Sequence, residues 1–271
     1  MDTCTLTLPS ALDDGRTCLA QGDYHAAAEI FSRLQEQHPY ALYYVWATTQ
    51  LQHSPSGEKL LACWDQVKEH FLTVPDSEAQ LYALCAQDAI RLLAFKVYRD
   101  CNENQLKQYT LLNKDVSFEK KEQVLSSLQK ILLEADRQYS AIFHVLFSLP
   151  QVILERIGNR DIESALLRAL FENANTAAEL CQEVSLPADL DLLELAAQLC
   201  ALPLPDDSEL TELRNSIVRL ALSDPAALER WDFWAEFAQA AGVDRSALEK
   251  KGKKLARKAK IKKLLSFKRS S

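Results

Sequence analysis

Residues 11–39 read ALDDGRTCLAQGDYHAAAEIFSRLQEQHP, and the spacing of their small and aromatic residues decides the fold. Gly15 lets two helices approach closely, because glycine has no side chain to hold them apart. Gly22 supplies a turn, and Asp23 is placed to cap the free N–H groups at the start of the next helix. That helix carries three residues at positions i, i+3 and i+7, which share one face: Tyr24, Ala27 and Phe31. The stretch therefore predicts two closely packed helices.

The same stretch resembles a tetratricopeptide repeat, a pair of antiparallel helices that stacks on neighbouring pairs. The family's pattern has a small residue late in the first helix, a Gly-Asp-Tyr turn, an alanine and an aromatic residue in the second helix, and a closing proline, here Pro39. One clear repeat covers about residues 8–41, and a degenerate second repeat, in which HSPSGE replaces the turn motif, runs to about residue 77. A helix over about residues 77–99 is expected to cap the stack. The resemblance implies stacked antiparallel helical hairpins, that is, an α-solenoid.

The resemblance also implies a function, because repeats of this family bind a peptide or a partner helix in a concave groove. Groove residues come from the first helix of each repeat, which gives Leu12, Arg16 and Leu19 in this chain. The family's groove for C-terminal carboxylates uses Lys, Asn and Arg, and at the corresponding places this chain has Leu12 and Arg16. Only one cation is therefore available there. The resemblance implies a protein–protein adaptor rather than that specialised carboxylate groove.

The composition of the whole chain predicts an all-α protein. The 271 residues include only 6 glycines and 9 prolines, 48% are hydrophobic and 25% are charged. Leu, Ala, Glu, Gln and Lys dominate, and all of them favour helices. Alternating runs of Val, Ile or Thr, which indicate strands, do not stand out.

Four segments are expected along the chain. Residues 1–100 form the repeats, and residues 101–117, which are polar and aperiodic, form a connecting segment. Residues 118–245 form a further helical domain, whose first long helix is expected to end near Pro150. Residues 246–271 form a basic tail.

The sequence favours a cytoplasmic protein. The N-terminus has no basic segment followed by a long apolar run, so no secretory signal is expected. The longest apolar run, Tyr139 to Leu154, is shorter than the roughly 20 residues that span a bilayer, so no transmembrane segment is expected. The seven cysteines form no CxxC pair, and their odd number argues against a disulfide framework. Four of them lie among apolar residues and are expected in the core: Cys63, Cys85, Cys181 and Cys200.

The C-terminal tail is the main electrostatic feature of the chain. Residues 245–271 contain twelve Lys or Arg and one Glu, which gives this segment a charge of about +11. Because the net charge of the whole chain is −7, the remaining residues carry a charge of −18. The cations expected to meet an anionic partner are Lys250, Lys251, Lys253, Lys254, Arg257, Lys258, Lys260, Lys262 and Lys263. The alternatives are a solvated extension, a tail folded back onto the acidic body, or contact with nucleic acid, an anionic membrane surface or an acidic protein. No apolar stripe persists along the tail, which favours loose electrostatic docking over a helix lying in a membrane surface.

No motif in the sequence indicates catalysis or a cofactor. None of the five histidines belongs to an HExxH motif, and there is no glycine-rich phosphate loop or GxSxG motif. Cys63 and His70 are seven residues apart, which is more typical of a core cysteine and a surface histidine than of a zinc site. Asp189, Asp191 and Glu194 stand where a helix is expected to begin, so we interpret them as capping residues. The sequence predicts a binding protein without metal or cofactor, and not an enzyme.

Overall fold

The computed structural model describes residues 6–112, 117–158, 162–184, 190–202, 204, 207–221 and 250. These residues form α-helices and short 3-10 turns with no strand among them, which confirms the all-α prediction. The chain divides into two compact units, Met1–Leu149 (unit 1) and Pro150–Ser271 (unit 2). The division thus falls inside a helix, and not at residue 118 where the sequence placed a domain boundary.

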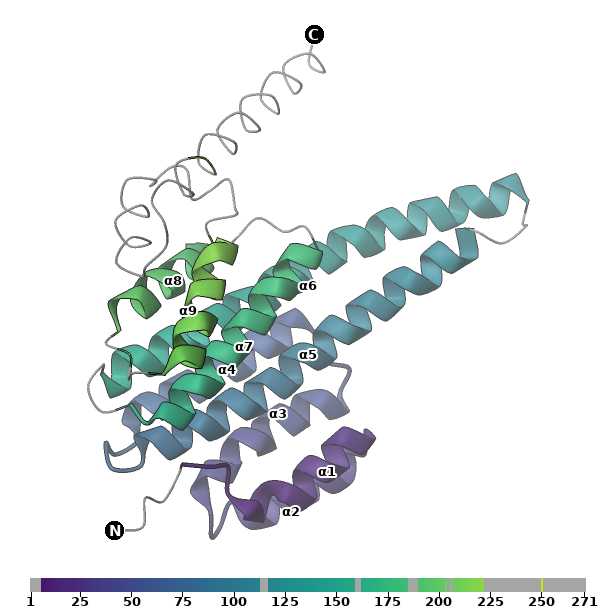
Figure 1. Ribbon diagram of the computed structural model, residues 1–271. Helices are drawn as coiled ribbons and strands as arrows, with labels where there is room; N and C mark the ends of the chain where they lie inside the picture. Colours follow the sequence, from purple (N-terminus) through teal and green to yellow (C-terminus); the bar gives the residue numbers. More distant parts are fainter. Residues whose placement is uncertain are drawn as a thin grey trace. The chain divides into compact units, whose positions relative to one another are not determined.

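Unit 1 contains six α-helices in its described part, the last of which crosses into unit 2 (Figure 1). Two 3-10 turns, η1 (Ser10–Leu12) and η2 (Pro39–Ala41), precede α1 and α3. The helices are α1 (Asp13–Gln21), α2 (Tyr24–Leu34), α3 (Leu42–Gln52), α4 (Gly57–Thr73), α5 (Ala79–Leu112) and α6 (Phe118–Ile157). Helix α1 packs on α2, α2 on α3, and α3 on both α4 and α5, while α4 also packs on α5.

The hairpin of α1 and α2 depends on the residues that the sequence singled out. A Cβ atom on Gly15 would lie 2.5 Å from ring atoms of Phe31, so the two helices pack as closely as they do only because residue 15 is glycine. Gly22 ends α1 with φ of 80°, in the left-handed region that favours glycine. The Asp23 carboxylate accepts a hydrogen bond from the N–H of Ala26 at 3.0 Å and so caps α2.

Helix α4 begins in close contact with α6. Ser56 caps α4 by accepting a hydrogen bond from the N–H of Lys59. A Cβ atom on Gly57 would lie 2.8 Å from the Cβ of Ala141, and the Gly57 N–H donates to the side-chain carbonyl of Gln138. Gly57 therefore lets α6 lie against the first turn of α4.

Helix α5 is longer than the sequence predicted. Residues 101–112 continue α5 instead of forming a connecting segment. Only a narrow edge of this part is half-buried, at Cys101, Gln105 and Gln108, and two of these three residues are polar. A helix that buries so little apolar surface shows no clear apolar periodicity, and so the sequence pattern did not reveal it.

Helix α6 continues through Pro150 and ends at Ile157, although a helix end was expected near this proline. Proline has no N–H, so the carbonyl four residues earlier loses its usual donor. The helix nevertheless continues, and its apolar residues on either side, Leu149 and Ile153, are both buried. Burial of these side chains offsets the lost hydrogen bond.

Three of the four cysteines expected in the core are found there. Cys63, Cys85 and Cys181 are buried, with at most 3% of their surface exposed. Burial raises the pKa of the Cys63 thiol to about 12, so it stays protonated at neutral pH. The side chain of Cys200 lies outside the described residues.

The described part of unit 2 is the end of α6 with three further helices, α7 (Ser164–Glu183), α8 (Leu190–Ala201) and α9 (Ser208–Ala221). Helix α9 packs on both α7 and α8. Arg168 on α7 forms ion pairs with Asp207, at 3.1 Å, and with Glu209. Asp207 also accepts hydrogen bonds from the first N–H groups of α9, at Glu209 and Leu210.

One of the described helices, α6, is long and apolar enough to cross a membrane by length and composition alone. Its most apolar window is 56% buried inside the protein. The buried core helix of a water-soluble protein passes the same test, so α6 does not by itself indicate a membrane protein.

Candidate functional site

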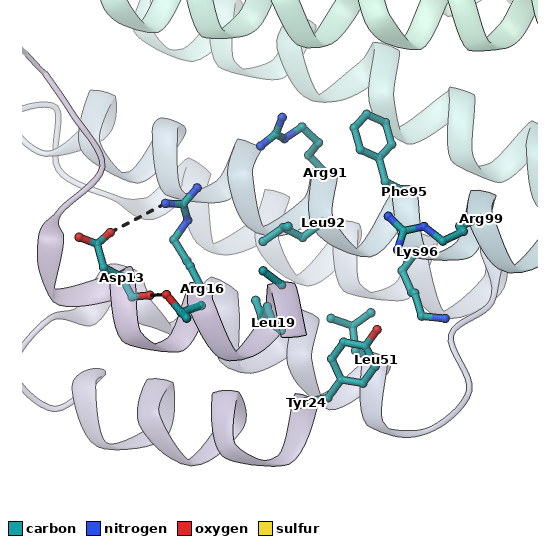
Figure 2. Close-up of a pocket in the computed structure, with 12 residues that line it drawn as sticks. Asp13, Arg16, Leu19, Tyr24, Leu51, Arg91, Leu92, Phe95, Lys96 and Arg99 are labelled. Carbon is teal, nitrogen blue, oxygen red and sulfur yellow. Dashed lines mark hydrogen bonds and ion pairs between the residues drawn. The ribbon is translucent and has the colours of Figure 1, made fainter. Parts of the chain in front are cut away.

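A pocket of about 540 Å³ lies in unit 1, with walls from α1, the first residue of α2, the end of α3 and the middle of α5 (Figure 2). The side chains that line it are Asp13, Arg16, Thr17, Leu19, Ala20, Tyr24, Leu51, Arg91, Leu92, Phe95, Lys96 and Arg99. A pocket of this volume is in the range that holds a small ligand or a few side chains of a peptide. Residues far apart in sequence build it, since α1 and α5 supply most of its lining.

Apolar side chains make up a large part of the lining. Leu19 and Leu51 are almost fully buried, and Leu92 and Phe95 are half-buried, so each offers an apolar surface to the pocket. Tyr24 lies beside Leu51 in the pocket (Figure 2). This part of the site would bind an apolar side chain by removing its surface from water.

Four cations and one carboxylate share the same lining. Arg16 comes from α1, and Arg91, Lys96 and Arg99 come from successive turns of α5, whereas Asp13 is the only acidic residue that lines the pocket. Arg16 lies between Asp13 and the rest of the site (Figure 2). The lining therefore carries an excess of positive charge beside its apolar surface, which attracts anionic groups.

A single buried carboxylate, Asp88, holds two of these cations in place. Asp88 is 6% exposed and accepts hydrogen bonds from Arg16 Nε at 2.9 Å and from Arg91 at 3.2 Å. The hydroxyl of Tyr44, on α3, donates to the same carboxylate at 2.7 Å. Asp88 thus joins α1, α3 and α5, and it orients two guanidinium groups of the pocket before any ligand arrives.

The charges in this network shift the pKa values of Asp88's partners. Burial lowers the pKa of Arg16, but the charge of Asp88 and its hydrogen bond outweigh burial, so the pKa of Arg16 rises above its ordinary value. Burial, followed by the charge of Asp88, raises the pKa of Tyr44 well above 10. Arg16 therefore stays charged and Tyr44 stays neutral, which keeps Tyr44 as a hydrogen-bond donor.

The cations that α5 supplies differ in how they are held. The guanidinium of Arg91 lies 6.0 Å from the ring centre of Phe95, and its buried Nε atom has no hydrogen-bond partner among the described residues. Lys96 forms an ion pair with Asp100 one turn later. Arg99 is exposed, and no ion-pair partner for it exists among the residues that the structure describes. Arg99 is thus the cation most available to a ligand.

A second hollow of about 470 Å³ continues from the pocket and shares Tyr24, Leu51 and Lys96 with it. Its other residues come from the end of α3, from the turn between α3 and α4 and from α5, where Glu103 and Lys107 leave it without a clear excess of either charge. The two hollows together form a groove that is positive at the pocket and mixed in charge beyond it.

The structure brings two of the three predicted groove residues into this pocket. Arg16 and Leu19 line it, but Leu12 is 0% exposed and does not, because it ends the 3-10 turn before α1 and packs into the core. Sequence reasoning did not find the residues of α5. Their spacing was the available signal, since Arg91, Phe95 and Arg99 recur every four residues and so share one face of a helix.

The basic tail lies almost entirely outside the described residues. Lys250 is described, and it is helical and exposed. The other tail cations lie outside that part of the chain: Lys251, Lys253, Lys254, Arg257, Lys258, Lys260, Lys262 and Lys263.

Comparison with known proteins assigns no family or ligand to this site. No protein-family model, curated protein or solved structure matches the chain. Within the described ranges, no group of three or more His, Cys, Asp or Glu side chains is arranged to hold a metal ion.

Proposed function

We propose that unit 1 is a tetratricopeptide-like stack of helical hairpins that binds a segment of a partner protein in the groove described above. The observation that carries this proposal is the pocket lined by α1, α3 and α5, which would be the first helices of three successive hairpins. The tight Gly15–Phe31 contact and the Asp23 cap support the same assignment of α1 and α2 to one repeat. The protein would then act as a non-catalytic adaptor in the cytoplasm.

The lining favours a particular kind of segment. An apolar side chain would pack on Leu19, Leu51 and Leu92, and a neighbouring carboxylate would meet Arg99 and the guanidinium groups at the pocket. Arginine forms paired hydrogen bonds with carboxylates, and a preoriented cation loses less freedom when it binds. We therefore expect a partner sequence in which Asp or Glu stands within a few residues of Leu, Ile or Phe.

The proposal can be tested by selecting binders from a displayed library of random peptides with the full chain as bait. Peptides enriched in acidic residues next to apolar ones are expected. Arg99→Glu should weaken binding of the selected peptides about tenfold, because it replaces an attractive contact with a repulsive one. Arg99 is the preferred position because it does not hold Asp88, so the change leaves the fold intact.

A matched control is Arg33→Glu, which reverses an exposed arginine on α2 outside the pocket. This variant should bind the selected peptides as the wild-type chain does. The groove assignment is incorrect if the selected peptides show no acidic preference, or if Arg99→Glu and Arg33→Glu weaken them equally.

A further inference from the structure

Beyond the groove, α5 and α6 together form an extension, which we call the arm and define as residues 105–112 of α5 and 119–135 of α6. Figure 1 shows both helices running on past α1–α4 of the same unit. At the base of the arm, the Tyr139 hydroxyl lies 2.8 Å from the Gln105 amide and also contacts Asn102. A short connection joins the two helices, so they run antiparallel.

Most of the exposed large apolar side chains in the described residues lie on the arm. Six such residues are exposed, and five belong to the arm: Leu106 at 66%, Tyr109 at 45%, Leu111 at 40%, Leu125 at 51% and Leu133 at 67%. The sixth, Leu72, is on α4. Such a concentration on one element is unusual for a surface in contact with water only.

Several of these side chains share one face of the arm. Leu106, Tyr109 and Leu125 each follow directly after a half-buried residue, namely Gln105, Gln108 and Val124. Moving one residue along a helix rotates the side-chain direction by about 100° around the helix axis. In two antiparallel helices that face each other, this rotation carries the next residue of each helix to the same side of the pair. An apolar face thus runs across both helices of the arm.

The charges of α6 indicate what covers this face. Residues 123–129 read QVLSSLQ, carry no charge and are centred on Ser126. Glu122 stands on one side of this segment and Lys130 on the other, and both are exposed. Neither has an ion-pair partner in the part of the chain that the structure describes. If helix α6 of a second copy paired antiparallel with this α6 and the pair were centred on Ser126, Glu122 of each copy would lie opposite Lys130 of the other. The pair would therefore contain two Glu122–Lys130 contacts.

We propose that the arm is a homodimer interface, in which the arms of two copies pair antiparallel to form a four-helix bundle. Two helices alone leave one apolar face exposed, and a bundle of four buries it. In such a bundle Leu125 lies next to the two-fold axis, and the two Glu122–Lys130 pairs fix the register. This interface is distinct from the pocket, since none of the residues lining the pocket belongs to the arm, and only Lys107, which lines the second hollow of the groove, belongs to both.

Charge reversal tests the proposal with the full chain. The wild-type protein should sediment as a dimer, and Glu122→Lys or Lys130→Glu alone should weaken dimerisation at least about tenfold, because each places like charges together at two positions. An equimolar mixture of the two variants should form dimers again, each with one copy of either kind, because every contact is then attractive. Circular dichroism would verify that both variants fold.

A second pair of variants addresses the apolar face. Leu125→Asp should abolish the dimer, and Leu72→Asp, at an equally exposed leucine on α4, should leave it intact. A wild-type chain that is monomeric at every concentration would overturn the proposal, even if the arm then bound vesicles or another protein. The same conclusion holds if the mixed charge variants stay monomeric, or if the Leu125 and Leu72 variants behave alike.

Discussion

Asp88 is a buried carboxylate on which three helices converge, and its removal should be costly. In Asp88→Ala, Arg16 and Arg91 lose a counter-charge and the buried Tyr44 hydroxyl loses its acceptor. Breaking such a buried network costs about 3 kcal/mol of unfolding free energy. Urea denaturation would measure this loss. Asp13→Ala is the control, because Asp13 is 61% exposed and 3.9 Å from Arg16, and its loss should cost less than about 0.5 kcal/mol.

His70 should make the stability of unit 1 depend on pH. Its Nδ1 atom lies 3.1 Å from the Tyr43 hydroxyl, and the rings of Tyr43, Trp46 and Tyr82 surround it. Burial lowers the pKa of His70 below 6.5, so below that pH the unfolded chain takes up a proton more readily than the folded one. This contribution to stability is present at neutral pH and is lost as the pH falls through the lowered pKa.

The test is to measure the free energy of unfolding of wild-type protein and of His70→Gln at about pH 7.5 and at about pH 5. Wild-type protein should lose more stability over this interval than His70→Gln, which cannot titrate at this position. Equal losses in both proteins would show that another group controls the acid response. His25→Gln, which removes an exposed histidine on α2, is the matched control.

At the scale of elements, the contact of α1 with α2 sets the spacing of the first hairpin. Gly15→Ala would place a Cβ atom 2.5 Å from the Phe31 ring, and overpacking of this kind costs about 1 to 3 kcal/mol. Replacing the ring with a smaller side chain, in the double variant Gly15→Ala with Phe31→Leu, should restore part of the lost unfolding free energy. The two changes together should therefore cost less than the sum of their separate effects in denaturation experiments.

Gly22→Ala separates this packing effect from backbone strain. Gly22 has φ of 80° and no atom within 4 Å of a Cβ placed there, so alanine would add only the strain of the left-handed conformation, about 1 kcal/mol. Adding Phe31→Leu to Gly22→Ala should not restore any of the lost stability. A rescue at Gly22 equal to that at Gly15 would contradict the packing explanation.

Local patterns in the sequence predicted local structure well. Gly15, Gly22 and Asp23 act through neighbours within about one helical hairpin, and the structure gives them the contacts that their chemistry indicated. The end of α5 and the passage of α6 through Pro150 were missed. The end of α5 buries too little apolar surface to show a periodic pattern. The passage of α6 through Pro150 depends on the burial of Leu149 and Ile153, and a pattern read along one helix does not contain that information.

The pocket is formed by helices from across unit 1, and the sequence indicated lining residues on α1 but not on α5. Arg16 and Asp88 are 72 residues apart, so nothing in the sequence near Arg16 shows that α5 lies opposite. The family resemblance supplied the first-helix residues Arg16 and Leu19. It did not supply Arg91 or Arg99, because the third hairpin carries no repeat motif from which to transfer them.

The charge difference between body and tail leads to a prediction for the whole molecule. If the tail binds nucleic acid, neutralising about eight phosphates of duplex DNA gives a log–log salt slope of about −7. Removing residues 246–271 should then abolish binding in a filter or gel-shift titration, because the remaining body is strongly acidic. Binding that survives the truncation, or that ignores salt, would contradict this role for the tail.

The Asp88 network also constrains how such a chain can diverge. One carboxylate serves a cation on α1, a hydroxyl on α3 and a second cation on α5. A substitution at Asp88 would leave two like charges facing each other, and a substitution at Arg16 would leave Asp88 with less compensation. Descendants of this chain should therefore exchange Arg16, Tyr44 and Asp88 as a set, and a lineage that loses this ion pair should acquire apolar residues at all three positions together.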